Sequence, residues 1–215
     1  MGSSPSRKRV RRIWGRSNSI NVQKVLWCCG ELDVRYERID VGGPFGGNRE
    51  PGYLRLNPNG LVPTISDGGF VLWESNAIVR YLAAKHGMGT LCPENLAERA
   101  DADRWMDWQM GMLWANLRPA FIGLIRTPPD ERDRASIAAA VRKTAENLAI
   151  LDAHLTGRDY VTGSSFTMAD IPLGTTAYRW FSLDIERAPM SNLEAWYERL
   201  CARLPYRANV MLPLS

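Results

Sequence analysis

The chain has 215 residues, of which 45% are hydrophobic and 23% are charged, the balance of an ordinary globular protein. At roughly 150 residues per domain this length predicts one or two domains with a sizeable core, and it argues against disorder or a collagen-like chain. The formal net charge is +4, but five basic residues lie in the first twelve positions, so the other 22 face 23 acidic residues. The body of the protein is therefore nearly neutral.

The basic start consists of Arg7, Lys8, Arg9, Arg11 and Arg12. We expect residues 1–10 to form a flexible basic tail, with a weak contact to anionic lipid or nucleic acid as the alternative. No apolar run follows that would make a secretory signal, and no apolar stretch is long enough to span a bilayer. The sequence thus favours a cytoplasmic protein with neither a membrane nor a nucleic-acid partner.

Cysteine and histidine are scarce and poorly placed for metal binding. The two histidines lie far apart, and the four cysteines, two of them adjacent, form no C-x-x-C pair: Cys28, Cys29, Cys92 and Cys201. We expect no metal and no disulfide. The adjacent pair is expected to pack inside as small apolar side chains.

Residues 11–87 carry alternating strand and helix signals. Short apolar stretches predict strands at 12–15 and 36–41, with a helix between them that Gly30 ends. After a glycine-rich loop, the stretches 61–65 and 70–73 flank Asp67-Gly68-Gly69 as a hairpin, and a helix follows from Ser75 to Gly87. The order β-α-β then β-β-α requires a right-handed crossover and a hairpin. This predicts a thioredoxin-like domain with a mixed four-stranded sheet.

Beyond a linker at 88–94 the pattern becomes helical, which makes the fold class α/β plus all-α, with a helical domain at 95–215. Two apolar stripes have helical spacing: Ile137, Val141, Thr144, Leu148, Leu151 and Leu155, then Leu193, Trp196, Tyr197, Leu200 and Leu204. Thr167-Met168-Ala169-Asp170 places an acid three residues after a hydroxyl, a variant of the capping box, with Phe166 and Ile171 positioned as a hydrophobic staple. This motif predicts a helix start.

Two segments suggest a binding site for an extended peptide. Asn57-Pro58-Asn59-Gly60-Leu61-Val62-Pro63 puts a proline into an apolar strand, which interrupts the ladder and leaves the backbone of Val62 available for strand addition. An edge strand without a ligand is the plain alternative. Glu74-Ser75 then opens a helix whose free N–H groups favour anions, although the pair also fits an ordinary helix cap.

These segments, with the F-T-x-A-D-I cap, occur in an order that resembles the soluble glutathione transferase family over roughly residues 11–205. The likeness is to its serine-type bacterial members and to theta- and phi-like branches. In that family the valine before a cis-proline pairs with the cysteinyl unit of glutathione, and an acid-serine pair holds the γ-glutamyl end. The resemblance assigns these roles to Val62, Pro63, Glu74 and Ser75.

The group that stabilises the thiolate follows the first strand in this family. The loop here runs Arg16-Ser17-Asn18-Ser19 and contains neither cysteine nor tyrosine, which favours a serine hydroxyl as hydrogen-bond donor. The register of the serine-type branches selects Ser19, five residues before Lys24. A competing register selects Ser17, and Asn18 is a third candidate donor; a purely structural role as loop and cap residues is the remaining alternative.

The resemblance implies further contacts to glutathione. We place Asn21 among them, and Asn48 and Arg49 near the glycine carboxylate, although a solvated arginine is equally compatible. Leu61 departs from the family pattern, because many members have a lysine, glutamine or arginine there. This difference predicts a weaker hold on that carboxylate.

The first long helix of the helical part is expected to line a second-substrate site. Large apolar residues cover too much of its circumference for a core stripe alone, so some are expected to face a cleft or another subunit. The candidates for the lining are Trp105, Trp108, Met112 and Trp114. Arg104 and Arg118 are candidates for orienting an anionic group, with solvated surface positions as the alternative.

The resemblance therefore implies a detoxifying transferase, a homodimer, that uses glutathione as co-substrate and conjugates it to hydrophobic electrophiles. Two alternatives remain open. One is a glutathione-dependent reductase of disulfides or peroxides, and the other is a glutathione-binding module without catalysis.

Overall fold

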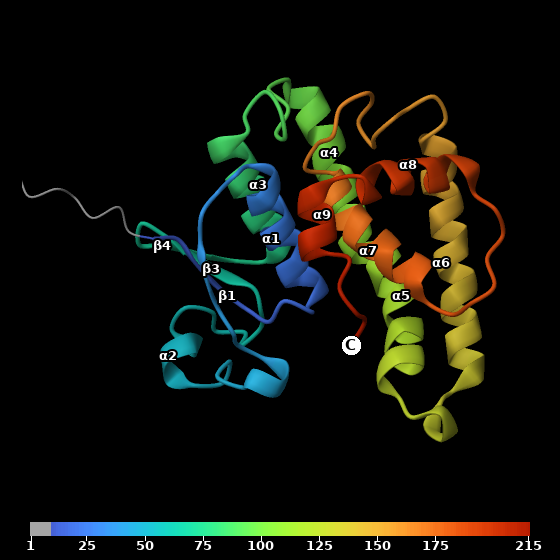
Figure 1. Ribbon diagram of the computed structural model, residues 1–215, viewed down its shortest axis with the longest axis horizontal. Coiled ribbons are helices and arrows are strands. Elements are labelled where there is room, and N and C mark those ends of the chain that lie inside the picture. Colours follow the sequence, from blue (N-terminus) through green and yellow to red (C-terminus); the bar gives the residue numbers. More distant parts are fainter. Residues whose placement is uncertain (1–9) are drawn as a thin grey trace, which may run out of the picture.

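The computed structural model describes residues 10–215, which form a sheet-containing part and a helical part side by side (Figure 1). The basic residues 7–9, and with them most of the expected tail, lie outside the described residues. The strands are β1 (Arg12–Trp14), β2 (Glu37–Ile39), β3 (Thr64–Asp67) and β4 (Phe70–Trp73). The helices of this part are α1 (Ile20–Glu31), α2 (Pro51–Leu54) and α3 (Ser75–His86).

The predicted thioredoxin-like topology is confirmed. The strand order is β2-β1-β3-β4, with β1 parallel to β2 and antiparallel to β3, and with β3 and β4 joined as a hairpin. Ile13 and Ile65 pair across the centre of the sheet and are fully buried. The short helix α2 and a 3-10 turn at Gly43–Phe45 lie within the loop that the sequence left without structure.

The helical part contains α4 (Leu96–Trp108), α5 (Trp114–Phe121), α6 (Arg134–His154), α7 (Asp170–Ser182), α8 (Ser191–Cys201) and α9 (Leu204–Asn209). Two five-residue π-helical segments, η2 (Gln109–Leu113) and η3 (Ile122–Arg126), adjoin α5 on either side. The chain therefore runs helically from α4 to η3 with a local change of pitch at each π segment, a feature often found at functional sites. Sequence periodicity did not reveal this change.

The two parts share one hydrophobic core. Trp27 of α1 is fully buried and its ring centroid lies 4.6 Å from that of Tyr206 in α9 and 5.4 Å from that of Phe166. Helix α1 thus packs against α3 on one side and against α7 and α9 on the other. Cys28 and Cys29 are buried in this core as predicted, and burial raises the pKa of Cys29 to about 12.

One predicted stripe is wrong at its end. Leu204 does not continue the helix of Leu193 to Leu200, because α8 stops at Cys201 and Leu204 begins α9 with 74% of its surface exposed. The proline that follows, Pro205, favours the first turn of a new helix, where its missing N–H costs nothing.

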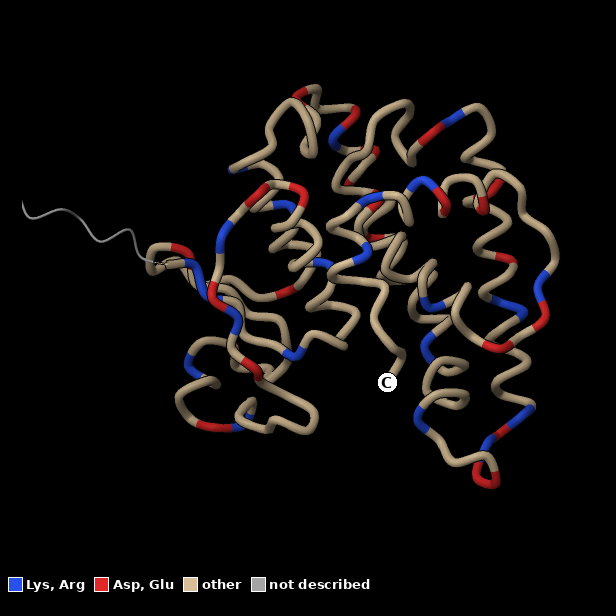
Figure 2. The backbone as a smooth tube through the Cα atoms, viewed as in Figure 1, with Lys and Arg blue, Asp and Glu red and all other residues tan. Residues whose placement is uncertain are grey.

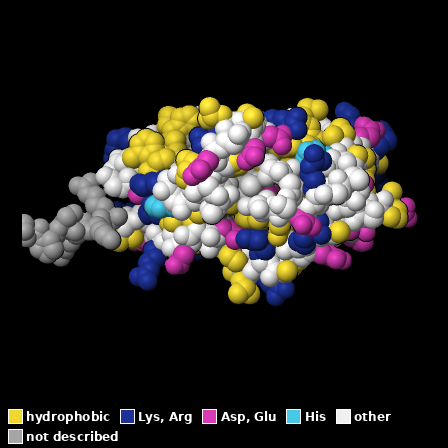
Figure 3. Space-filling model, turned by 90° about the horizontal axis from the view of Figure 1, so that it is seen from above, with side chains coloured by type: hydrophobic (Ala, Val, Ile, Leu, Met, Phe, Trp, Pro, Cys, Tyr) yellow, Lys and Arg dark blue, Asp and Glu magenta, His cyan; other side chains and the backbone are white. Residues whose placement is uncertain are grey.

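The charges of the described residues are spread over both parts of the backbone (Figure 2). Two residues of the basic start belong to the fold, since Arg11 pairs with Asp67 at 2.8 Å and Arg12 with Glu37 at 3.1 Å. On the face seen in Figure 3, basic and acidic side chains are interspersed rather than separated. None of the helices between residues 10 and 215 is both long and apolar enough to cross a membrane.

Candidate active site

Ser19 lies where the chain turns from β1 into α1. It is the N-cap residue, with extended φ and ψ of −78° and 126°, and its carbonyl accepts the first helical hydrogen bond from Gln23 at 2.9 Å. Its hydroxyl makes no capping bond, although the residue is only 8% exposed. The hydroxyl and the free N–H groups of the first turn therefore meet at one place, an arrangement suited to an anion.

The loop before β3 brings Leu61 and Val62 to the same place. Asn57 and Tyr53 donate to the carbonyl of Leu61, and Asn48 donates to the carbonyl of Gly60 at 2.8 Å. The Val62-Pro63 peptide is cis. Among the described residues neither the N–H nor the carbonyl of Val62 has a hydrogen-bond partner, so both are free to pair with an extended ligand.

Helix α3 begins beside α1. Ser75 is buried and donates to Asn21 of α1 at 3.3 Å, so the two helix N-termini are joined by a side-chain contact. Glu74 is the exposed N-cap residue of α3, with a φ of 71°, which is unusual for a residue with a side chain. Strained backbone of this kind concentrates at functional positions, and here it turns a carboxylate outward beside a helix N-terminus.

Ser19, Asn21, Leu61 and Val62 line a cavity of about 260 Å³ between the two parts, whereas Glu74 and Ser75 are outside its lining. The sheet-containing part contributes Arg16, Asn18, Ser19, Ile20, Asn21, Leu61 and Val62. The helical part contributes Trp114, Arg118, Phe121, Ile122, Arg126 and Arg179. Five of these six lie on α5 and η3 at a helical spacing that starts from Trp114, and Arg179 comes from α7.

Several predicted residues do not line this cavity. Trp105 is 7% exposed and packs on Trp108 and His154, and Met112 is exposed, so Trp114 is the one residue of the expected lining that the cavity includes. Ser17 is also outside the lining.

Asn48 and Arg49 both bond to backbone carbonyls of the turn before Leu61, at Gly60 and Asn59 respectively. Pro63 follows the lining residue Val62 but is not itself in the lining, and Glu74 is also outside the lining. The roles predicted for these four residues toward glutathione stay predictions.

Sequence reasoning missed Arg126 and Arg179. Arg126 lies twelve residues after Trp114, which on a regular α-helix is about 120° away from it. The π segment η3 changes the pitch there, so helical spacing in the sequence did not reveal Arg126 as a lining residue. Arg179 is 2% exposed and donates to Gln23 at 2.8 Å; burial lowers its pKa to about 9. Its one signal in the sequence is a lone arginine in the apolar stretch of α7.

Lys24 is fully buried beneath the site. Its ammonium group donates to Asn76 at 3.2 Å and to Gln109 at 3.0 Å, and it lies 3.5 Å from the Ser75 hydroxyl. Burial is the largest influence on this amine and lowers its pKa to about 7. The lysine thereby links α1 to α3 and to the π segment η2, a role that its position in the sequence did not reveal.

The low pKa of Lys24 predicts a pH-dependent stability. The unfolded chain keeps this amine protonated up to about pH 10, whereas the folded protein releases the proton near pH 7. Because the unfolded chain binds more protons between these pH values, the contribution of Lys24 to the free energy of unfolding increases as pH rises. Between pH 7.0 and 8.5 we expect the free energy of unfolding of the wild type to rise by about 1.5–2 kcal/mol more than that of Lys24→Met. Urea titrations of both proteins at the two pH values measure the gain; parallel pH profiles would contradict it.

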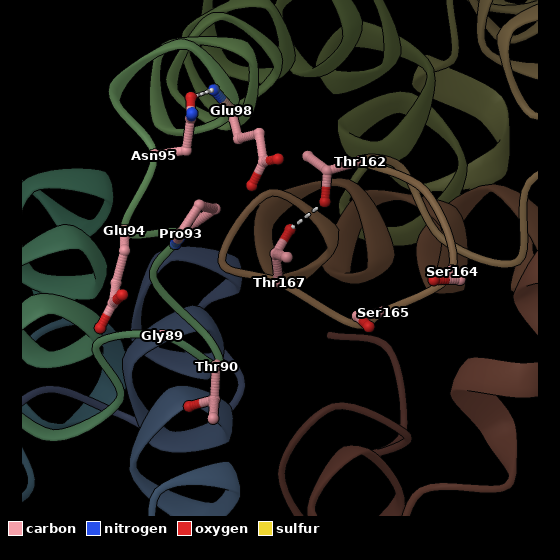
Figure 4. A pocket seen from close by; sticks show the side chains of 10 residues that line it. All are labelled: Gly89, Thr90, Pro93, Glu94, Asn95, Glu98, Thr162, Ser164, Ser165 and Thr167. Atoms are coloured by element: carbon pink, nitrogen blue, oxygen red, sulfur yellow. Dashed lines mark hydrogen bonds between the residues drawn. The ribbon is translucent and has the colours of Figure 1, made fainter.

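A second hollow, of about 530 Å³, lies at the junction of the linker and the loop before α7 (Figure 4). Several of its polar groups already make structural hydrogen bonds. Asn95 caps α4 by accepting from the N–H groups of Ala97 and Glu98, and Thr162 and Thr167 bond to each other at 3.0 Å. We therefore place no chemistry there. Within residues 10–215 no group of histidine, cysteine or acidic side chains is arranged to hold a metal ion.

Comparison with known proteins agrees with this geometry. The family description "Glutathione S-transferase, N-terminal domain" matches residues 18–85, and "Glutathione S-transferase, C-terminal domain" matches residues 109–203. Glutathione S-transferase GstB of Escherichia coli (strain K12) is 43% identical over 205 residues, which are 94% of this chain and 99% of that protein. Glutathione S-transferase 3 of Zea mays is 31% identical, with 93% and 92% covered.

Solved structures show the same likeness. The theta class glutathione S-transferase from Xanthomonas axonopodis pv. citri, solved with glutathione bound, superposes with a TM-score of 0.92 at 52% identity, over 96% of this chain and 99% of that one. The glutathione transferase BmGSTD1 of Bombyx mori superposes with a TM-score of 0.83 at 26% identity, over 94% and 93%. This chain belongs to the glutathione S-transferase family and is a glutathione S-transferase.

Proposed function

We propose that this transferase binds glutathione across the N-termini of α1 and α3 and conjugates it to hydrophobic electrophiles, with the hydroxyl of Ser19 donating to the thiolate. The observation that carries the proposal is the position of Ser19, a nearly buried N-cap residue whose hydroxyl is not used for capping and lines the cavity. Because the helix dipole and a hydroxyl donor both favour a thiolate over a thiol, this place lowers the pKa of a bound thiol.

The rival donors fit less well. The Asn18 side chain is engaged on both sides, accepting from Arg16 at 2.6 Å and donating to the Ser215 hydroxyl. Ser17 lies outside the cavity lining. The adjacent thiols of Cys28 and Cys29 do not suit a mixed-disulfide mechanism, since both are buried and burial raises the pKa of both.

Glutathione is held, in this proposal, by the free backbone of Val62, by Ser75 with Asn21, and by Glu74. The structure of the Xanthomonas relative with glutathione bound supports the choice of ligand. In the reaction the thiolate sulfur forms a bond to an electrophilic carbon, and the leaving group departs with its bonding electrons. The protein supplies position and thiolate stabilisation rather than a nucleophile of its own.

Retention on immobilised glutathione followed by a turnover panel tests this function. We expect retention, elution by free glutathione, and turnover of aryl or benzyl halides. Faster turnover of disulfides or peroxides than of halides would instead support the reductase. Retention without any turnover would support a binding module.

We further propose that the protein is a homodimer. Large apolar side chains are exposed on both parts, including Phe70 and Trp73 on β4, Leu96 on α4 and Met112 on η2. Symmetric pairing is the commonest way to cover such surface. Light scattering at micromolar concentration is expected to give twice the mass of one chain. A single-chain mass would contradict the dimer.

A further inference from the structure

The cavity beside Ser19 contains an excess of positive charge. Four guanidinium groups line it, those of Arg16, Arg118, Arg126 and Arg179, and no aspartate or glutamate is among the lining residues. Within residues 10–215 none of the four pairs with an aspartate or glutamate. The arginines that pair with an aspartate or glutamate in the described chain lie outside the lining of this cavity.

Within the described chain, the hydrogen bonds of these arginines go to groups other than aspartate and glutamate. Arg16 donates to the Asn18 side chain, and Arg126 donates to an oxygen of Ser215, the last residue of the sequence, at 2.9 Å. Arg179 donates to Gln23 and Thr175, and its buried Nε has no partner among the described residues. Arg118 is exposed and makes no hydrogen bond to another described residue. An anion placed in the cavity would therefore meet unused donors.

The positive charges of Arg16, Arg126 and Arg179 repel one another. Burial, and then the positive charge of Arg126, lowers the pKa of Arg16, and both Arg126 and Arg16 act in the same direction on Arg179. Solvent screens this repulsion only partly, in contrast to the repulsion within a solvated surface cluster, because Arg179 is buried and Arg16 is half-buried. A bound anion relieves it.

Aromatic rings lie between the charges. The Arg126 guanidinium is 5.2 Å from the centroid of Phe121, and the Arg179 guanidinium lies 5.5 Å from the same ring and 5.9 Å from Trp114. A ligand that contacts Trp114 or Phe121 with an apolar group thus comes within reach of a guanidinium. The cavity combines an apolar surface with donors that suit a carboxylate.

We propose that the electrophile of this transferase is anionic: an aromatic or apolar carbon skeleton that contacts Trp114 and Phe121, with a carboxylate or similar group held by Arg118 and Arg126. This inference rests on the proposed function, which places the glutathione sulfur at Ser19. For a benzylic chloride, the carbon–sulfur bond forms as the carbon–chlorine bond breaks, chloride leaves with the electron pair, and the thiol proton passes to solvent. The anionic group takes no part in the bond changes and sets specificity.

A matched pair of electrophiles tests the charge. 4-(Chloromethyl)benzoate and its methyl ester share the reacting carbon and the leaving group and differ in the anion. Relative to the uncatalysed reaction with glutathione, we expect the enzyme to favour the acid in kcat/KM. Arg118→Gln and Arg126→Gln are each expected to lower the acid-to-ester ratio by about fivefold or more, and Arg118→Lys to restore part of it.

Arg35→Gln is the control, because it removes the same charge from an exposed position outside the cavity and is expected to leave the ratio unchanged. An unchanged ratio in Arg118→Gln and Arg126→Gln would overturn the proposal. So would an equal loss for acid and ester together with weaker glutathione binding, since the arginines would then hold glutathione itself.

Binding of the products separates this inference from the function. By calorimetry, S-(4-carboxybenzyl)glutathione is expected to bind more tightly than its methyl ester, and Arg118→Gln to reduce that difference. Equal binding of the two overturns the anionic electrophile. Tighter binding of the acid without turnover of either chloride would overturn the proposed conjugation reaction but would still support the anion site.

Discussion

Asp170→Ala is expected to lose about 3–5 kcal/mol of stability, the largest effect of any single change considered for the fold. Asp170 is fully buried, and its carboxylate accepts from the backbone N–H groups of Val161 and Thr167 at 3.0 and 2.9 Å and from the Trp196 indole at 2.8 Å. Alanine leaves all three donors buried without a partner. Urea unfolding measures the loss, and Asp184→Ala removes an exposed carboxylate as the control.

The pH dependence of that loss provides a second check. Burial raises the pKa of Asp170 to about 6, above its value in the unfolded chain, so the contribution of this group is largest at low pH and falls as pH rises from about 4 to 6. The difference between wild type and Asp170→Ala should therefore be about 1 kcal/mol greater at pH 5 than at pH 7. A greater difference at pH 7 would contradict a pKa raised by burial.

Glu74→Ala is expected to weaken glutathione binding by roughly 10- to 150-fold, the equivalent of about 1.5–3 kcal/mol for a charge-assisted hydrogen bond. The carboxylate lies at the start of α3, beside the Ser75–Asn21 contact, where the γ-glutamyl ammonium is proposed to bind. Because that group is remote from sulfur, turnover of bound glutathione should change less than affinity.

Calorimetric titration with glutathione measures the effect. Glu94→Ala is the matched control, since it removes an exposed carboxylate from the linker. Glu74→Gln is expected to lie between wild type and Glu74→Ala, because it keeps the oxygen acceptor and loses the charge. An unchanged dissociation constant in Glu74→Ala would remove Glu74 from the site.

The fold was predictable where its signals are local. A glycine-bounded hairpin around Asp67-Gly68-Gly69, alternating apolar stretches and the Thr167–Asp170 cap define elements by themselves, and the structure confirms the sheet, the hairpin and the helix after the cap. The cap works through one of its two expected bonds: Asp170 accepts from the N–H of Thr167, while the Thr167 hydroxyl lies 3.0 Å from that of Thr162. The local pattern thus identified the helix start to within a few residues, because α7 begins at Asp170 with Ala169 rather than Thr167 as its N-cap.

The site was predictable only in part. Ser19 and Val62 lie at element boundaries that proline and strand patterns mark, so their positions follow from the sequence. Lys24 and Arg179 are charged residues in helices, where the default is exposure, and their burial depends on partners such as Gln109 and Gln23 that are distant in the chain. Trp105 illustrates the reverse case: it was expected to line the second-substrate site, but it is buried and packs against His154.

The central claim is that the Ser19 hydroxyl stabilises the thiolate of bound glutathione, and the most direct measurement is the ultraviolet absorbance of that thiolate as a function of pH in Ser19→Ala and Ser17→Ala. We expect Ser19→Ala to raise the pKa of the bound thiol by about one unit or more, which corresponds to about 1.4 kcal/mol and a tenfold loss of turnover near neutral pH, with little change in affinity. Ser17→Ala should leave the titration close to that of the wild type. A larger shift in Ser17→Ala, or no shift in either variant, would contradict the claim.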